Sequence, residues 1–243
     1  MESTVKKRDP FYFKSFTVEQ EGATMKVGTD GVLLGAWANV TKVKRVLDIG
    51  TGTGVIALMI AQRQPKASVI GVEIDPNAYE VAVKNFQSSN WSSRLKVINQ
   101  SIQDFSQNES TFDLIVCNPP FFTGGTLSNN ADRAEVRHTI KLPHNDLLRS
   151  IRKLLSSEGR FCVVLPLLEG LRFKEMAESA GLYCSKLTEV KGHVDKNVER
   201  VLLEFTKRPS ITKVDTLAIN QSNTRHDYTD AYRTLVEDFY TIL

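Results

Sequence analysis

The sequence contains little cysteine and no long apolar run. Only three of the 243 residues are cysteine, and their odd number and apolar neighbours favour buried, reduced side chains over disulfides. The four histidines are scattered and no cysteines are paired, so the spacing of a zinc site is missing. No apolar segment approaches the roughly 20 residues that cross a bilayer. We therefore expect neither a bound metal nor a membrane span.

An excess of charge of one sign is also lacking. The formal net charge is only +3, which is too small to indicate a nucleic-acid partner by itself. The first ten residues hold no apolar stretch of the kind found in a secretory signal. Together with the reduced cysteines, this predicts a cytoplasmic protein. Hydrophobic residues make up 41% and charged residues 24%, which is an ordinary globular composition.

Short apolar strands alternate with helical segments from about residue 43 onward. Near-continuous apolar strands separated by helices indicate an α/β fold with a parallel sheet covered on both faces. The last two strands have no helix between them and must be antiparallel to each other. Seven strands are predicted, at residues 43–49, 68–74, 95–99, 112–117, 160–165, 183–190 and 198–205.

No linker rich in glycine, serine or proline divides the chain. We predict one domain with a core at residues 43–207, an N-terminal extension at 1–42 and a C-terminal extension at 208–243. The N-terminal extension should contain a helix that starts near Thr29. The C-terminal extension should consist of a polar loop, at about 211–227, and a helix. One apolar face of that helix is expected to pack on the core, through Tyr232, Leu235, Phe239 and Ile242.

The first core strand ends in a glycine-rich turn, Asp48-Ile49-Gly50-Thr51-Gly52-Thr53-Gly54. Glycines permit positive φ angles and let a ligand approach the backbone, and the next helix presents free N–H groups. In open α/β sheets, ligands bind at this kind of switch point. The G-x-G-x-G spacing does not fit the dinucleotide fingerprint G-x-G-x-x-G. With the preceding acid, Asp48, it resembles the first motif of class I methyltransferases that use S-adenosylmethionine.

This resemblance implies a Rossmann-like, seven-stranded, mostly parallel sheet with one antiparallel strand and helices on both faces. It also implies three cofactor contacts. Glu73 would accept hydrogen bonds from the ribose hydroxyls, Ile74 would lie against the adenine ring, and Asp104 would accept from the adenine amine. The end of the second strand has a second interpretation, since Asp75 followed by Pro76 is typical of a helix cap. Both interpretations can hold together.

The fourth strand ends in Asn118-Pro119-Pro120-Phe121-Phe122. Prolines fix the backbone and lack N–H groups, so this turn offers carbonyl acceptors without backbone donors. The Asn118 side-chain oxygen and the Pro119 carbonyl could each accept one N–H of an exocyclic amine and direct its lone pair at a sulfonium methyl. Phe121 could stack on the base. The structural alternative is a rigid turn followed by two buried aromatic residues.

Together with residues 25–37 and 198–205, these motifs resemble the bacterial tRNA1(Val) (adenine-37-N6)-methyltransferase family over nearly the whole chain. The family implies methyl transfer from S-adenosylmethionine to N6 of a tRNA adenine, with no membrane and no obligatory protein partner. The same amino-methylation of guanine N2 in ribosomal RNA, or of a protein glutamine, stays open. A silent RNA-binding module is disfavoured by the intact motifs, and a nucleotide-linked oxidoreductase by the glycine spacing.

The segment before the core offers further cofactor contacts. Thr29 or Asp30 could cap the helix that begins there, and its free N–H groups would then face the methionine carboxylate of the cofactor. Lys26 is an additional charge partner for that carboxylate.

The polar segment 123–141 follows the catalytic turn directly and should border the substrate. Within it, Arg133 and Arg137 are spaced for one face of a short helix. They either contact RNA phosphates or pair with nearby acidic residues. Phe122, next to Phe121, is a further candidate for contact with the RNA.

Overall fold

The computed structural model describes residues 8–23, 25–108, 110–119, 144–224 and 226–241. Its main strands are β3 (Arg45–Ile49), β4 (Ser68–Glu73), β5 (Leu95–Asn99), β6 (Phe112–Cys117), β7 (Leu155–Pro166), β8 (Tyr183–His193), β9 (Val198–Thr206) and β10 (Lys213–Asn220). The helices are α1 (Thr29–Trp37), α2 (Val55–Arg63), α3 (Pro76–Gln87), α4 (Ile102–Asn108), α6 (His144–Leu154), α7 (Leu167–Ser179) and α8 (Asp230–Val236), with one 3₁₀ turn, η1 (Ser92–Arg94).

The eight main strands form one sheet in the order β10-β8-β9-β7-β6-β3-β4-β5. Strand β9 runs antiparallel to both of its neighbours, β7 and β8, and the other pairings are parallel. The order reverses at β3, because the chain passes from β3 outward to β4 and β5 and then returns to β6 on the other side. The carboxyl ends of β3, β4 and β6 therefore meet at a switch point, where α/β sheets bind ligands.

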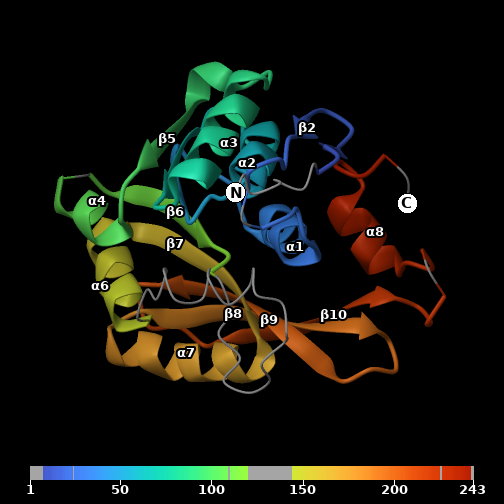
Figure 1. Cartoon of the computed structure of the whole chain (residues 1–243). Helices are drawn as coiled ribbons and strands as arrows, with labels where there is room; N and C mark the ends of the chain where they lie inside the picture. The colour runs from blue at the N-terminus through green and yellow to red at the C-terminus, as the bar shows by residue number, and fades with distance from the viewer. Residues whose placement is uncertain (1–7, 24, 109, 120–143, 225, 242–243) are drawn as a thin grey trace, which may run out of the picture.

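Helices cover both faces of the sheet, as predicted (Figure 1). On one face, α1, α2, α3 and α8 bury an apolar core that includes Leu34, Met59 and Phe239. On the other face, α4, α6 and α7 bury a second core that includes Ile151 and Phe173. Strands such as β3, β6, β7 and β9 contribute side chains to both cores, so their sequences are near-continuous apolar runs.

The two ends of the described chain lie side by side. A short hairpin, β1 (Phe11–Tyr12) with β2 (Thr17–Val18), precedes α1, and Phe13 forms an isolated bridge with Tyr240 beyond α8. The buried side chains of Phe13, Tyr232 and Phe239 join the α1–α2 core, although Phe239 lies after the end of α8 and not in the helix. Ile242 lies outside the described residues. The division of the chain at residues 42 and 207 stays a prediction.

The predicted strand count was wrong, because the sheet has eight strands rather than seven. The additional strand, β10, occupies about half of the segment predicted to be a polar loop, and it pairs in parallel with β8 at the edge of the sheet. Of its residues only Leu217 is buried, and Val214 is 64% exposed. Backbone hydrogen bonds hold this edge strand, so its side chains lack the apolar pattern on which sequence prediction depends.

Candidate active site

A pocket of about 260 Å³ opens at the carboxyl ends of β3, β4 and β6. Its lining comes from the segment before α1, the glycine turn, the end of β4, the start of α4, the end of β6 and the start of α6. The predicted site residues that line it are Lys26, Gly50, Gly52, Glu73, Ile74, Asn118 and Pro119. The sheet topology thus gathers most of the predicted site residues that the structure describes, although they span more than ninety positions in the sequence.

The glycine turn between β3 and α2 uses a left-handed backbone at all three glycines. The φ angles are +66° at Gly50, +56° at Gly52 and +82° at Gly54, which only glycine adopts without strain. At Gly54 a Cβ atom would also lie 2.5 Å from the Phe86 ring of α3. Gly50 and Gly52 line the pocket, whereas Gly54 is buried behind it. The turn therefore brings bare backbone to the pocket wall.

Asp48 lies behind this turn and does not line the pocket. Its side chain is fully buried, and it accepts a hydrogen bond of 2.7 Å from the Thr51 hydroxyl. Burial raises the pKa of Asp48 to about 7, and the bond from Thr51 opposes this shift. Asp48 therefore holds the glycine turn in place through its hydrogen bond with Thr51.

Glu73 joins two parts of the pocket wall. One of its carboxylate oxygens accepts a 2.9 Å hydrogen bond from the Gly52 N–H, and the other accepts one of 2.9 Å from the Asp75 N–H. Burial raises the pKa of Glu73 above its usual value. The neighbouring Ile74 side chain is 47% exposed and lines the pocket, so it is available to a flat ligand.

Asp75 caps α3, as its sequence context predicts. Its carboxylate accepts hydrogen bonds from the Asn77 and Ala78 N–H groups, at 2.7 and 3.1 Å. Pro76 occupies the start of the helix, where no N–H is needed. The end of β4 therefore combines a capping residue, Asp75, with a pocket residue, Glu73.

Asn118 directly follows β6 and lines the pocket together with Pro119. Its side-chain oxygen is buried and has no hydrogen-bond partner among the described residues. The side chain lies close to the first turn of α1, because a Cβ atom at Gly31 would be 3.9 Å from the Asn118 side-chain nitrogen. An unpaired buried acceptor is costly, and here it lies where a ligand with N–H groups could pair with it.

Cys117, beside Asn118, also lines the pocket. Burial raises the pKa of its thiol far above the usual range, so the sulfur stays protonated at neutral pH. The thiol is therefore not a nucleophile here, because nucleophilic attack requires the thiolate.

The capping role predicted for Thr29 or Asp30 was wrong. The N-cap of α1 is Gly28, and no side chain caps this helix. Thr29 is the first residue of the helix, one position too late to fold back onto the free N–H groups, and it is exposed and not part of the pocket lining. Asp30 forms an ion pair with Arg200 instead. Lys26 and Gly28 are the residues of this segment that do line the pocket.

Asp104 lies behind the pocket wall rather than in it. Its carboxylate accepts a 2.6 Å hydrogen bond from the Ser101 hydroxyl, and the Ser101 oxygen accepts one from the Asp104 N–H at 3.1 Å. Ser101 and Gln103 line the pocket, whereas the exposed Asp104 does not. Its predicted contact with the adenine amine stays a prediction.

His144 lines the pocket, and sequence reasoning missed it. It begins α6, its ring meets Phe173 edge-on at a centroid distance of 5.2 Å, and burial lowers its pKa. One weak signal was present in the sequence, since a histidine starts the helix after the polar segment. Five other predicted residues lie outside the described part of the chain, namely Pro120, Phe121, Phe122, Arg133 and Arg137.

The sequence predicts no metal site and no membrane span. Within the described residues, no group of three or more histidine, cysteine, aspartate or glutamate side chains could hold a metal ion. In the same part of the chain, no helix has both the length and the apolar character of a membrane span.

Comparison with known proteins identifies the relatives of this chain. The family model of the methyltransferase small domain matches residues 27–166. The tRNA1(Val) (adenine(37)-N6)-methyltransferase of Proteus mirabilis is 44% identical and covers 95% of this chain and 93% of its own length. The enzymes of the same name from Trichodesmium erythraeum and Christiangramia forsetii are 43% and 40% identical, each covering 95% of this chain and 97% of its own length.

Solved structures of lower identity share the fold. A predicted O-methyltransferase of Agrobacterium tumefaciens has a TM-score of 0.64 at 18% identity, covering 86% of this chain and 96% of its own. A glycopeptide N-methyltransferase in complex with S-adenosylmethionine has a TM-score of 0.56 at 12% identity, covering 75% and 100%. The chain therefore belongs to the tRNA1(Val) (adenine(37)-N6)-methyltransferase family and has the fold of S-adenosylmethionine-dependent methyltransferases.

Proposed function

We propose that this chain transfers a methyl group from S-adenosylmethionine to N6 of adenine 37 in tRNA1(Val). The observation that carries the proposal is the unpaired, buried side-chain oxygen of Asn118 in the pocket wall. The names of the relatives support the tRNA substrate. A tRNA substrate also favours a cytoplasmic location, as does the sequence.

The Asn118 oxygen is suited to hold an amine. It would accept one N–H of the adenine amine, and the carbonyl of Pro119 would accept the other. An exocyclic amine is a poor nucleophile, because its lone pair is delocalised into the ring, and two acceptors would fix the direction of that lone pair. The rate gain would come from positioning and from preorganised dipoles. The proton released after transfer needs no strong base, because the methylated amine is acidic while it carries the extra proton.

The remaining pocket residues fit the cofactor, which supplies an electrophilic methyl group on a sulfonium sulfur. Glu73 is a buried carboxylate that can accept from ribose hydroxyls, and Ile74 exposes an apolar side chain for the adenine ring. Gly50 and Gly52 let the ligand approach the backbone. Lys26 lies in the same wall and would pair with the carboxylate of the methionine part.

An adenine beside the anticodon must leave its stack before it can reach such a pocket. Phe121, Phe122, Arg133 and Arg137 stay the proposed RNA contacts, and Asp104 the proposed contact to the cofactor adenine.

The test replaces Asn118 with alanine. We expect methyl transfer to a tRNA1(Val) transcript to fall by roughly 10²–10³-fold, while the dissociation constant for S-adenosylmethionine changes little. The readouts are N6-methyladenosine by mass spectrometry and cofactor binding by calorimetry. Asn145→Ala is the matched control, because Asn145 is exposed on α6 and does not line the pocket.

Several outcomes would contradict the proposal. Unchanged turnover in Asn118→Ala would show that the amide oxygen does not hold the amine, and loss of cofactor binding would assign the residue to the cofactor instead. A transcript with guanosine at position 37 should accept no methyl group. If the wild-type protein formed N2-methylguanosine in ribosomal RNA, or methylated a protein glutamine, the adenine target would be wrong.

A further inference from the structure

Helix α1 belongs to the segment before the core, yet its first turn forms part of the active-site wall. Met25, Lys26, Gly28 and Gly31 line the pocket, and Gly31 lies against the Asn118 side chain. No side chain caps the start of this helix. The position of the catalytic amide therefore depends on contacts that hold α1 against the sheet.

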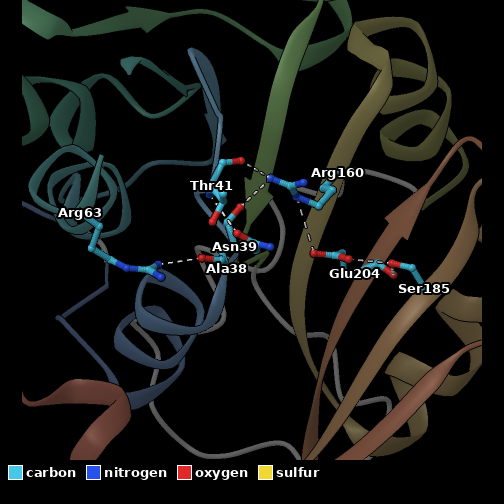
Figure 2. A network of polar contacts seen from close by, with 7 residues as sticks. All are labelled: Ala38, Asn39, Thr41, Arg63, Arg160, Ser185 and Glu204. Carbon is cyan, nitrogen blue, oxygen red and sulfur yellow. Dashed lines mark hydrogen bonds and ion pairs between the residues drawn. The ribbon is translucent and has the colours of Figure 1, made fainter. Parts of the chain in front are cut away.

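Two arginines hold the C-terminal end of α1 (Figure 2). The Arg63 guanidinium, from α2, donates to the backbone carbonyls of Gly35 and Ala38 at 2.8 and 2.7 Å. Arg160, from β7, donates to the carbonyls of Asn39 and Thr41 at 3.0 and 3.2 Å.

Glu204 extends this network to the other strands of the sheet. Its carboxylate lies 3.9 Å from the Arg160 Nε atom and accepts a 2.8 Å hydrogen bond from the Ser185 hydroxyl (Figure 2). The end of α1 and the turn after it are thus tied to α2, β7, β8 and β9.

Within the described residues, one ion pair reaches the start of α1, beside the apolar packing of Val32. Asp30, the second residue of the helix, pairs with Arg200 of β9, and the Arg200 guanidinium also lies 3.2 Å from the Glu199 carboxylate. The side chains of Arg200 and Asp30 are 26% and 25% exposed. Because Asp30 is adjacent to Gly31, this pair acts on the turn that contacts Asn118.

We infer that Arg200 is a positioning residue for methyl transfer, because its ion pair with Asp30 keeps the first turn of α1 against Asn118. This inference rests on the proposed function, in which Asn118 holds the amine. A displacement of about 1 Å in a catalytic geometry can reduce the rate roughly 10²-fold. A partly exposed ion pair, by contrast, contributes little to stability. Removing it should therefore affect turnover more than folding.

The experiment measures kcat, KM for the cofactor, Tm and amide hydrogen exchange for the wild type and Arg200→Ala. We expect kcat to fall at least about 10-fold, with KM for S-adenosylmethionine within about twofold and Tm within a few degrees. Exchange at residues 29–33 should become faster. Arg208→Ala is the matched control, because Arg208 pairs with Glu158 on an exposed surface and should leave all four quantities unchanged.

A charge exchange separates the ion pair from the loss of a side chain. Asp30→Arg and Arg200→Asp should each be impaired, and the double variant should recover a large part of kcat. Arg200→Lys should retain more activity than Arg200→Ala, because it keeps the charge.

The inference is wrong if Arg200→Ala retains wild-type kcat, if exchange in α1 does not change, or if the activity loss follows a loss of folding in every variant. If the wild-type protein transferred no methyl group to tRNA, the proposed function would fail instead. The exchange rates of α1 would still show whether Arg200 fixes this helix.

Discussion

Asp48 shows how burial sets the chemistry of a single residue. Its pKa in the folded protein is raised to about 7, whereas that of an aspartate in an unfolded chain is about 4. Between these values the folded protein keeps a proton that the unfolded chain has released. Stability from this group is therefore present at low pH and is lost as the pH rises towards 7. Above that value the group contributes no further change.

This difference predicts a pH-dependent effect of Asp48→Asn, which cannot ionise. We expect the unfolding free energy of the wild type to fall relative to the variant between about pH 4 and 7, by at most about 1.4 kcal/mol per pH unit. Urea unfolding of both proteins at a series of pH values measures this difference. A difference that did not vary with pH would contradict the raised pKa.

Lys26 and Thr29 are close in the sequence, but the sequence does not determine which of them lines the pocket. Both lie in the segment that was expected to face the cofactor, but only Lys26 lines the pocket. The helix begins at Thr29 with Gly28 as its N-cap, and the exposed Thr29 does not line the pocket. A sequence does not locate the end of a helix to within one residue, so this difference could not be predicted.

The turn between β3 and α2 is the element that the sequence predicts best. Its three glycines permit positive φ angles, and in the structure all three adopt them. The structure also shows that the three glycines differ in the space around them, which their spacing in the sequence does not indicate. A Cβ atom at Gly50 would meet nothing within 4 Å, whereas one at Gly54 would collide with the Phe86 ring.

This difference predicts unequal effects of two alanine substitutions. Gly50→Ala should cost roughly 1–2 kcal/mol of stability from backbone strain alone. Gly54→Ala should cost a further 1–3 kcal/mol or so from overpacking against α3. Chemical denaturation of both variants provides the comparison. Equal losses of stability would show that Phe86 moves aside without cost.

Strand β10, in contrast to the glycine turn, could not be predicted from the sequence. Strands β7 and β9, inside the sheet, are buried on both faces and could be predicted from their apolar runs, whereas β10 pairs with β8 at the sheet edge. An edge strand is stabilised mainly by backbone hydrogen bonds, which every residue except proline can form. The sequence therefore gave no sign that this segment extends the sheet.

At the scale of the whole molecule, cofactor binding should stabilise the fold, because the pocket is assembled from the segment before α1 and from several strand ends. A ligand at 100 times its dissociation constant adds about 2.7 kcal/mol to the unfolding free energy. For a chain of this size, that corresponds to a rise in Tm of roughly 5–10 °C. Thermal unfolding with S-adenosylmethionine, and with NAD as the control, tests this expectation. A larger shift with NAD would contradict the cofactor assignment.

The sequence by itself determined the α/β class, the glycine turn and the strand-end residues Glu73, Asp75 and Asn118. Each depends on short-range chemistry, such as apolar period, glycine conformation and proline geometry. Only the tertiary structure decided that His144 lines the pocket, that Arg200 pairs with Asp30, and that the Asn118 oxygen lacks a described partner. These features join residues that are far apart in the chain. Their contacts depend on how strands and helices pack, which no local pattern in the sequence records.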